Sequence, residues 1–347
     1  MRFALALAVA AVLGVAATAS GRSTARGIPH GFRPEAAAAV GKRDYWILGS
    51  YRCGTSFCNA LVRSTDAGKH FARVAVPPFR AQGTVPTIVF PNARDGFAYV
   101  EDATPLFVTR DGGESWHREG PDRSVTAFAA GGGYAYLLAG RHRVERSRVG
   151  GNAWRRLALT VSHRPLSLAA RGSDVWLLGP PRRRPDFDTI ELSPDRGRTS
   201  TARKGPCLSE LGGTLAPAPG GVVWAVCPTG NFGELSLSRN GGRSFPTIRS
   251  AHEPGGLRQP ALVNSARIAA ASAHIAVLDR GAGGALLRTT DAGRHWRAVP
   301  GTAQLQEVLW LGFSTRRVGA ALVETHDRSE LLRTTDAGAS WHSVPIR

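Results

Sequence analysis

The fold follows from the stretch Thr334-Thr335-Asp336-Ala337-Gly338-Ala339-Ser340-Trp341, of which the chain contains seven versions. The shared pattern is Ser or Thr, any residue, Asp, any residue, Gly, two further residues and an aromatic. Three versions depart from it: Asn240 or Val149 replaces the Asp, and Ser200 replaces the aromatic. The seven versions occupy residues 64–71, 109–116, 147–154, 193–200, 238–245, 289–296 and 334–341.

Each residue type in this pattern suits a tight turn between two strands. A short apolar run precedes the copies, as at Leu331-Leu332, and another follows, as at Trp296-Arg297-Ala298-Val299. Asp and Ser or Thr can accept hydrogen bonds from nearby backbone N–H groups, and Gly adopts a positive φ without a Cβ clash. The aromatic is large enough to wedge into the adjacent layer. We therefore predict hairpin turns, built by Asp66, Gly68, Asp111, Gly113, Asp195, Gly197, Asn240, Gly242, Asp291, Gly293, Asp336 and Gly338.

The spacing of the copies predicts the number of structural units. Successive Asp-equivalent positions lie 38 to 51 residues apart, which is the length of a four-stranded propeller blade. Repeats of a stacked solenoid are usually shorter. We predict an all-β chain that forms one seven-bladed β-propeller over residues 32–347, with the repeated turn between strands three and four of most blades.

The repeated stretch resembles the Asp-box, or BNR repeat. This motif occurs in sialidases, sortilin-type receptor ectodomains, xyloglucan-degrading glycoside hydrolases and photosystem II stability/assembly factor-like proteins, and the pattern here is closest to the last group. In these families the motif lies between the third and fourth strands of a propeller blade. The resemblance covers the chain from about residue 61 to residue 347, and it implies a fold rather than an activity.

The N-terminal residues have the pattern of a secretion signal. A basic residue, Arg2, precedes the apolar run Phe3 to Val15, and Ala17-Thr18-Ala19 matches a cleavage site. The run is shorter than a typical transmembrane helix. We predict a signal peptide over residues 1–19, a flexible lead over residues 20–31, and a secreted or extracytoplasmic protein without a membrane span.

Cysteine usage agrees with export. The four cysteines are an even number, which favours disulfides over free thiols in an exported protein. Cys53 and Cys58 flank a short loop in blade one, whereas Cys207 and Cys227 flank the junction of blades four and five. The sequence leaves the connectivity open. No second Cys or His pair completes a metal site with Cys53 and Cys58, so we expect no metal and no cofactor.

The formal net charge of +18 arises mostly from arginine. Nucleic-acid binders can be this basic, but the arginines are scattered and export argues against a nucleic-acid partner. A basic protein is attracted to anionic surfaces. We expect a monomer that binds a protein, an anionic glycan or a cell-surface polymer.

The resemblance implies that ligands bind opposite the repeated turns, at the loops between strands two and three and between blades. The most distinctive of these loops is Arg182-Arg183-Arg184-Pro185-Asp186-Phe187-Asp188. It is either a solvated charge run or a contact for acidic ligands, since arginine binds carboxylates through two hydrogen bonds. The candidate ligand-face residues are Tyr51, Glu101, Asp102, Arg182, Arg183, Arg184, Asp186, Asp188, Asp327 and Arg328.

Catalysis has little support in the sequence. A sialidase-like site needs an arginine triad, a Tyr–Glu pair and an acid, and Arg26-Gly27-Ile28-Pro29 does not match the Arg-Ile-Pro of sialidases. Other glycoside hydrolases need two facing carboxylates, which the spacing does not identify. We predict a binding or assembly scaffold without catalysis; the alternative is an exo-acting glycoside hydrolase, such as a sialidase-like enzyme.

Overall fold

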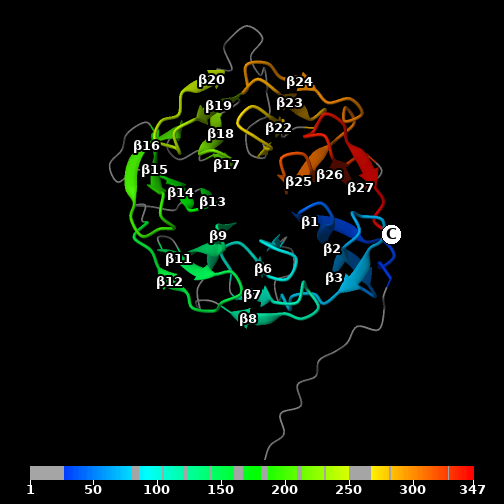
Figure 1. Cartoon of the computed structure of the whole chain (residues 1–347). Coiled ribbons are helices and arrows are strands. Elements are labelled where there is room, and N and C mark those ends of the chain that lie inside the picture. The colour runs from blue at the N-terminus through cyan, green and yellow to red at the C-terminus, as the bar shows by residue number, and fades with distance from the viewer. Residues whose placement is uncertain are drawn as a thin grey trace, which may run out of the picture.

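The computed structural model is an all-β ring of seven four-stranded antiparallel sheets, shown in Figure 1. Each sheet consists of four strands that are consecutive in the sequence, so each is one propeller blade. The predicted seven-bladed β-propeller is therefore confirmed. The structure describes residues 27–79, 86–103, 105–119, 124–140, 143–159, 167–180, 187–208, 213–229, 232–249, 267–280, 283–326 and 328–347.

The strands of the first four blades have the following bounds. Blade one contains β1 (Arg33–Val40), β2 (Asp44–Cys53), β3 (Ser56–Ser64) and β4 (Ala72–Val74), and blade two contains β5 (Thr87–Val89), β6 (Gly96–Tyr99), β7 (Leu106–Thr109) and β8 (His117–Glu119). Blade three contains β9 (Val125–Gly131), β10 (Tyr134–Ala139), β11 (Arg143–Arg148) and β12 (Arg155–Arg156), and blade four contains β13 (Ser167–Arg171), β14 (Asp174–Gly179), β15 (Phe187–Ser193) and β16 (Thr201–Leu208).

The remaining three blades continue in the same order. Blade five contains β17 (Thr214–Ala218), β18 (Val222–Thr229), β19 (Phe232–Ser238) and β20 (Thr247–Arg249), and blade six contains β21 (Ile268–Ala270), β22 (Ala276–Leu278), β23 (Leu287–Thr289) and β24 (Arg297–Ala298). Blade seven contains β25 (Glu307–Phe313), β26 (Gly319–Glu324), β27 (Ser329–Thr334) and β28 (His342–Val344).

The core is divided into seven apolar clusters, one at each junction between neighbouring blades. The ring closes where β1 packs against β25, β26 and β27, without a strand exchanged between the ends of the ring (Figure 1). At this junction the Arg333 Nε donates a 2.9 Å hydrogen bond to the Tyr45 hydroxyl. Within the described residues, no helix could cross a membrane.

The repeated turn joins the third and fourth strands of the blades, as predicted. In blade seven, the Thr334 hydroxyl accepts the Gly338 N–H at 2.9 Å, and Asp336 accepts the Ser340 N–H at 3.0 Å. Gly338 has a φ of 83°, which is favourable for glycine and strained for other residues. Asn240 forms the same bond to the Ser244 N–H at 3.0 Å, so the amide substitutes for the carboxylate.

The four cysteines form two disulfides, Cys53–Cys58 and Cys207–Cys227. The first lies within the β2–β3 hairpin of blade one. The second joins β16 of blade four to β18 of blade five, and both of its cysteines are buried. Disulfides persist in oxidising compartments outside the cytosol. The signal peptide predicted over residues 1–19 lies outside the described residues, as does most of the predicted lead, although Ile28 packs against the core at the junction of blades seven and one.

Candidate functional site

Antiparallel strands give the propeller two distinct faces. We call one the turn face; it carries the turns between strands one and two and between strands three and four of each blade. We call the other the loop face; it carries the hairpins between strands two and three and the connections between blades. The repeated turns define the turn face, and the sequence-based prediction placed ligand binding on the loop face.

The predicted loop-face residues that the structure describes are distributed over four blades. Tyr51 lies in blade one, Glu101 and Asp102 in blade two, Asp188 in blade four and Arg328 in blade seven. Only Glu101 and Asp102 are direct neighbours, and they are so in the sequence. The other candidates, Arg182, Arg183, Arg184, Asp186 and Asp327, lie outside the described residues.

Several of these side chains have described partners within or next to their own blade. The Tyr51 hydroxyl accepts a 3.1 Å hydrogen bond from Arg73, whose guanidinium carbon lies 5.3 Å from the centre of the phenol ring. Asp102 accepts a 2.9 Å hydrogen bond from the Thr126 hydroxyl, and Arg328 pairs with Glu330 at 2.6 Å. The described partner of Tyr51 is thus an arginine, and not the glutamate of a sialidase-like pair.

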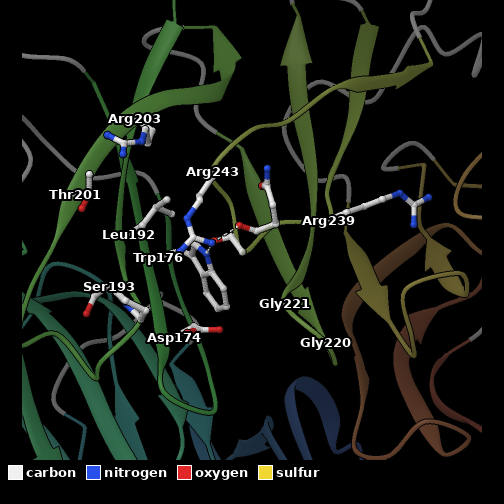
Figure 2. Close-up of a pocket in the computed structure, with 13 residues that line it drawn as sticks. Asp174, Trp176, Leu192, Ser193, Thr201, Arg203, Gly220, Gly221, Arg239 and Arg243 are labelled. Atoms are coloured by element: carbon white, nitrogen blue, oxygen red, sulfur yellow. Dashed lines mark hydrogen bonds between the residues drawn. The ribbon is translucent and has the colours of Figure 1, made fainter.

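A pocket of about 360 Å³ opens on the turn face between blades four and five (Figure 2). Its floor includes Trp176 and Leu192, and its rim carries polar and charged side chains from both blades. The charged lining residues are Asp174, Arg203, Arg239 and Arg243. In Figure 2 Arg243 extends from the turn of blade five toward Trp176, Arg203 approaches from β16, and Arg239 extends away from both. With three cations and one carboxylate, the lining favours an anionic ligand.

The pocket lies at a junction where an aliphatic residue precedes the turn serine. Arginine stands immediately before the turn Ser or Thr in blades one, three, six and seven, as at Arg63, whereas Val108, Leu192 and Leu237 occupy this position in blades two, four and five. In blade one the Arg63 guanidinium spans the junction to blade two and donates a 3.2 Å hydrogen bond to the Ala93 carbonyl oxygen. A leucine is shorter and has no donor, so no guanidinium from β15 spans the junction between blades four and five.

The two positions share a tryptophan contact to the following blade, although in blade one the Phe90 ring also stacks on Trp46 at 3.9 Å. The Trp46 indole donates to the Gly112 carbonyl oxygen of blade two, and the Trp176 indole donates to the Gly241 carbonyl oxygen of blade five, each at 2.8 Å. The blade-one pair is completed by Asp44, whose carboxylate lies 3.6 Å from Arg63. The junction of blades four and five thus keeps the indole hydrogen bond of blade one and has an apolar side chain in place of its guanidinium.

Asp174 occupies the position of Asp44 in blade four. Burial raises the pKa of the Asp174 carboxyl, and the positive charge of Arg243 partly opposes this increase. Arg243 thus supplies, from blade five, a charge that Arg63 supplies in blade one. The Arg243 Nη1 donates a 3.0 Å hydrogen bond to the Asn240 carbonyl oxygen. Because a guanidinium carries five N–H donors, this bond leaves capacity for a ligand.

The carboxylates of the repeated turns accept hydrogen bonds from residues of the same turn. The pKa of Asp195 is lowered to about 2, first because the Thr199 N–H donates to it, with a further bond from the Thr199 hydroxyl and against an opposing effect of burial. For Asp336 burial raises the pKa, but bonds from the Ser340 hydroxyl and N–H lower it more, to about 2. Hydrogen bonds from N–H and hydroxyl groups of the same turn therefore stabilise these negative charges.

Arginines also gather near the centre of the turn face. Arg171 lies at the end of β13, beside the turn to the second strand of blade four, and Arg316 lies in the corresponding turn of blade seven. Burial lowers the pKa of Arg171, and the charge of Arg316 lowers it further. The two positive charges therefore interact across the ring, which favours an anion between them.

The sequence-based prediction did not identify the pocket, although a signal was present. The residue before each turn Ser or Thr is arginine in four blades and aliphatic in three, and the sequence alone does not show that this residue lies at a junction between blades. Within the part of the chain that the structure describes, no group of three or more His, Cys, Asp or Glu could hold a metal ion.

Neither a protein-family model nor a curated protein matches the chain. Solved structures share its fold at low sequence identity. A structure of YCF48 bound to D1 peptide is 17% identical, with a TM-score of 0.61 over 89% of this chain and 95% of that one. YCF48 from Cyanidioschyzon merolae is 14% identical, with a TM-score of 0.59 over 89% of this chain and 97% of that one.

Structures of larger hydrolases also contain this fold. A Mycobacterium tuberculosis puromycin-hydrolyzing peptidase is 13% identical, with a TM-score of 0.62 over 91% of this chain. The match covers only 53% of the peptidase, so the propeller corresponds to about half of that protein. At these identities the comparisons establish the architecture of this chain as a seven-bladed β-propeller.

Proposed function

We propose that this chain is an extracytoplasmic scaffold propeller of the Asp-box type that binds an acidic segment of a protein partner and catalyses no reaction. The observation that carries the proposal is the pocket between blades four and five, where Arg203 and Arg243 line a cavity floored by Trp176. Guanidinium groups bind carboxylates strongly, and an indole offers apolar contact to the rest of the segment.

Three further observations support this role. The YCF48 structure described as bound to D1 peptide indicates that a propeller of this architecture can hold a peptide. The two disulfides fit an oxidising compartment, in agreement with the proposed signal peptide over residues 1–19. The carboxylates of the repeated turns are hydrogen-bonded within their own turns, whereas Arg203 and Arg243 line the pocket.

The test uses a fluorescein-labelled hexaglutamate peptide and measures its binding to the oxidised protein by fluorescence anisotropy. Removing one charge-assisted hydrogen bond changes the binding free energy by about 1.5–3 kcal/mol. We therefore expect Arg243→Gln to weaken binding at least about tenfold. Arg297→Gln is the matched control, because Arg297 is an exposed arginine on the outer strand of blade six.

Two results would contradict the proposal. Binding that is insensitive to Arg243→Gln but lost in a triple Arg182→Gln, Arg183→Gln, Arg184→Gln variant would place the ligand on the loop face instead. Hydrolysis of sialosides or aryl glycosides that disappears in Tyr51→Phe would make the protein a glycoside hydrolase. A hexagalacturonate competitor that displaces the peptide would extend the ligand class to anionic glycans.

A further inference from the structure

The hairpin between β2 and β3 extends beyond the rest of blade one. The inner neighbour β1 pairs with β2 only as far as Ser50, and the outer neighbour β4 pairs with β3 only as far as Leu61. From Tyr51 to Cys58 the two strands pair only with each other in the described ladders. These eight residues therefore form a two-stranded projection on the loop face, separate from the pocket between blades four and five.

The projection is held in a fixed shape. The Cys53–Cys58 disulfide joins its two strands, and the turn is closed by only two residues, Gly54 and Thr55. Gly54 has a φ of 67°, as such a tight turn requires. On the same side as the disulfide, Arg73 stacks on Tyr51 and donates to its hydroxyl. An isolated hairpin of this length would be marginal without such restraints.

The other side of the projection presents an unusual pair of side chains. Phe57 is 69% exposed, and it is the large hydrophobic side chain that stands out as exposed among the described residues. Arg52 lies directly opposite it in the register and is also exposed. Directly opposite residues of an antiparallel pair share one face, so the tip presents an aromatic ring and a guanidinium together. Neither has a structural role in the propeller core.

We propose that this tip inserts Phe57 into the headgroup region of an anionic membrane while Arg52 contacts lipid phosphate. Aromatic and basic side chains together are the combination found where proteins lie on membranes, and anionic lipids attract basic residues near the surface. The net charge of +18 draws the whole molecule toward such a surface. A two-residue contact on a narrow hairpin is small beside the roughly 800 Å² per partner of a standard protein interface, so lipid fits better than a protein pocket.

Co-sedimentation of the oxidised protein with vesicles tests this proposal. We expect binding to vesicles of equal parts phosphatidylglycerol and phosphatidylcholine, and little binding to pure phosphatidylcholine. Phe57→Ser should reduce the partition coefficient about tenfold, because the apolar contact is lost. Arg52→Gln should reduce it about fivefold, whereas Arg198→Gln, an exposed arginine on the turn face, should change it by less than about twofold.

A second variant reports insertion directly. Phe57→Trp should gain fluorescence that brominated lipid quenches beyond the quenching of the wild type, whose eight native tryptophans provide the baseline. Wild-type protein that does not sediment, or a Phe57→Ser variant that sediments equally well, overturns the proposal. If a Phe57-dependent crosslink to a protein is found in place of vesicle binding, the tip is a protein-docking element. The failure of the peptide assay on the turn face would not affect these outcomes.

Discussion

Leu192 in blade four occupies the position that Arg63 occupies in blade one, and it lines the pocket at the junction of blades four and five. Both residues immediately precede the turn serine, and both lie next to a tryptophan whose indole donates to the following blade. Blade one therefore serves as a comparison for blade four, because it shows the same kind of junction with a guanidinium in the space between the blades.

Leu192→Arg should close the pocket. The new guanidinium would lie beside Asp174, as Arg63 lies beside Asp44, and would occupy the space proposed for the acidic ligand. We expect hexaglutamate binding to weaken at least about tenfold, with the free energy of unfolding unchanged within about 1 kcal/mol, because the carboxylate of Asp174 gains a partner. Fluorescence anisotropy and urea denaturation measure the two quantities.

Leu192→Met serves as the control for this variant, since it conserves volume and keeps the pocket open. It should retain wild-type affinity. A Leu192→Arg protein that is folded and binds the peptide as tightly as wild type would show that the ligand lies elsewhere.

Gly242→Ala should destabilise the propeller more than Gly220→Ala. Both glycines have positive φ, 90° and 80°, so alanine is strained at either position by about 1 kcal/mol. A Cβ at Gly242 would lie 2.8 Å from the Trp176 Nε1, whereas one at Gly220 would meet nothing within 4 Å. Overpacking adds about 1–3 kcal/mol. We expect losses of about 2–4 and about 1 kcal/mol in urea denaturation; equal losses would contradict the close packing of the turn against Trp176.

The fold was predictable because each blade contains its own copy of the turn sequence between strands three and four. The turn at Asp336 recurs with the spacing of a blade, and even Asn240 keeps the necessary acceptor, so local chemistry determined the architecture. The third blade forms its turn without an Asp, and the Val149 N–H donates to the Gly133 carbonyl oxygen at 3.0 Å, much as the Ala337 N–H donates to the Arg317 carbonyl oxygen in blade seven. The local pattern therefore predicted the number of blades, although some copies of the turn lack the Asp or the aromatic residue.

The pocket was not predictable from the same pattern because it depends on contacts between blades. Leu192 is unremarkable in a strand, and its effect is visible only beside Trp176 and the turn of blade five. The pairing of Cys207 with Cys227 was also left open, since it joins β16 to β18 across a blade junction. Such relationships depend on how sheets pack, and the sequence predicts this less directly than it predicts turns.

The two disulfides should contribute unequally to stability. In the chain-entropy description, a disulfide stabilises more when it closes a longer loop, and Cys207–Cys227 spans 20 residues against 5 for Cys53–Cys58. Replacing both cysteines of the longer loop by alanine should reduce the free energy of unfolding by about 3 kcal/mol, against about 2 kcal/mol for the shorter loop. Urea denaturation of the two double variants measures this difference, and the opposite order would contradict it.

Acid should destabilise the repeated turns through their carboxylates. The folded pKa of Asp195 is about 2, below the value of about 3.9 in an unfolded chain. A lowered folded pKa means that the stabilisation is complete above about pH 4 and is lost as the pH falls toward 2. A fully shielded carboxylate with this shift would contribute about 2.6 kcal/mol, but Asp195 is partly exposed, so we expect about 1 kcal/mol.

Asp195→Asn tests this origin, because Asn240 shows that an amide can accept the same backbone hydrogen bond. The variant should lose stability at pH 7, and its free energy of unfolding should fall less steeply between pH 4 and pH 2 than that of the wild type. Urea denaturation at pH 5, 4, 3 and 2 gives both slopes. Parallel slopes would mean that the Asp195 carboxylate is not stabilised by the turn, and that acid acts through other groups. Equal stability at pH 7 with a reduced slope would mean that the hydrogen-bond geometry, and not the charge, fixes the turn at neutral pH.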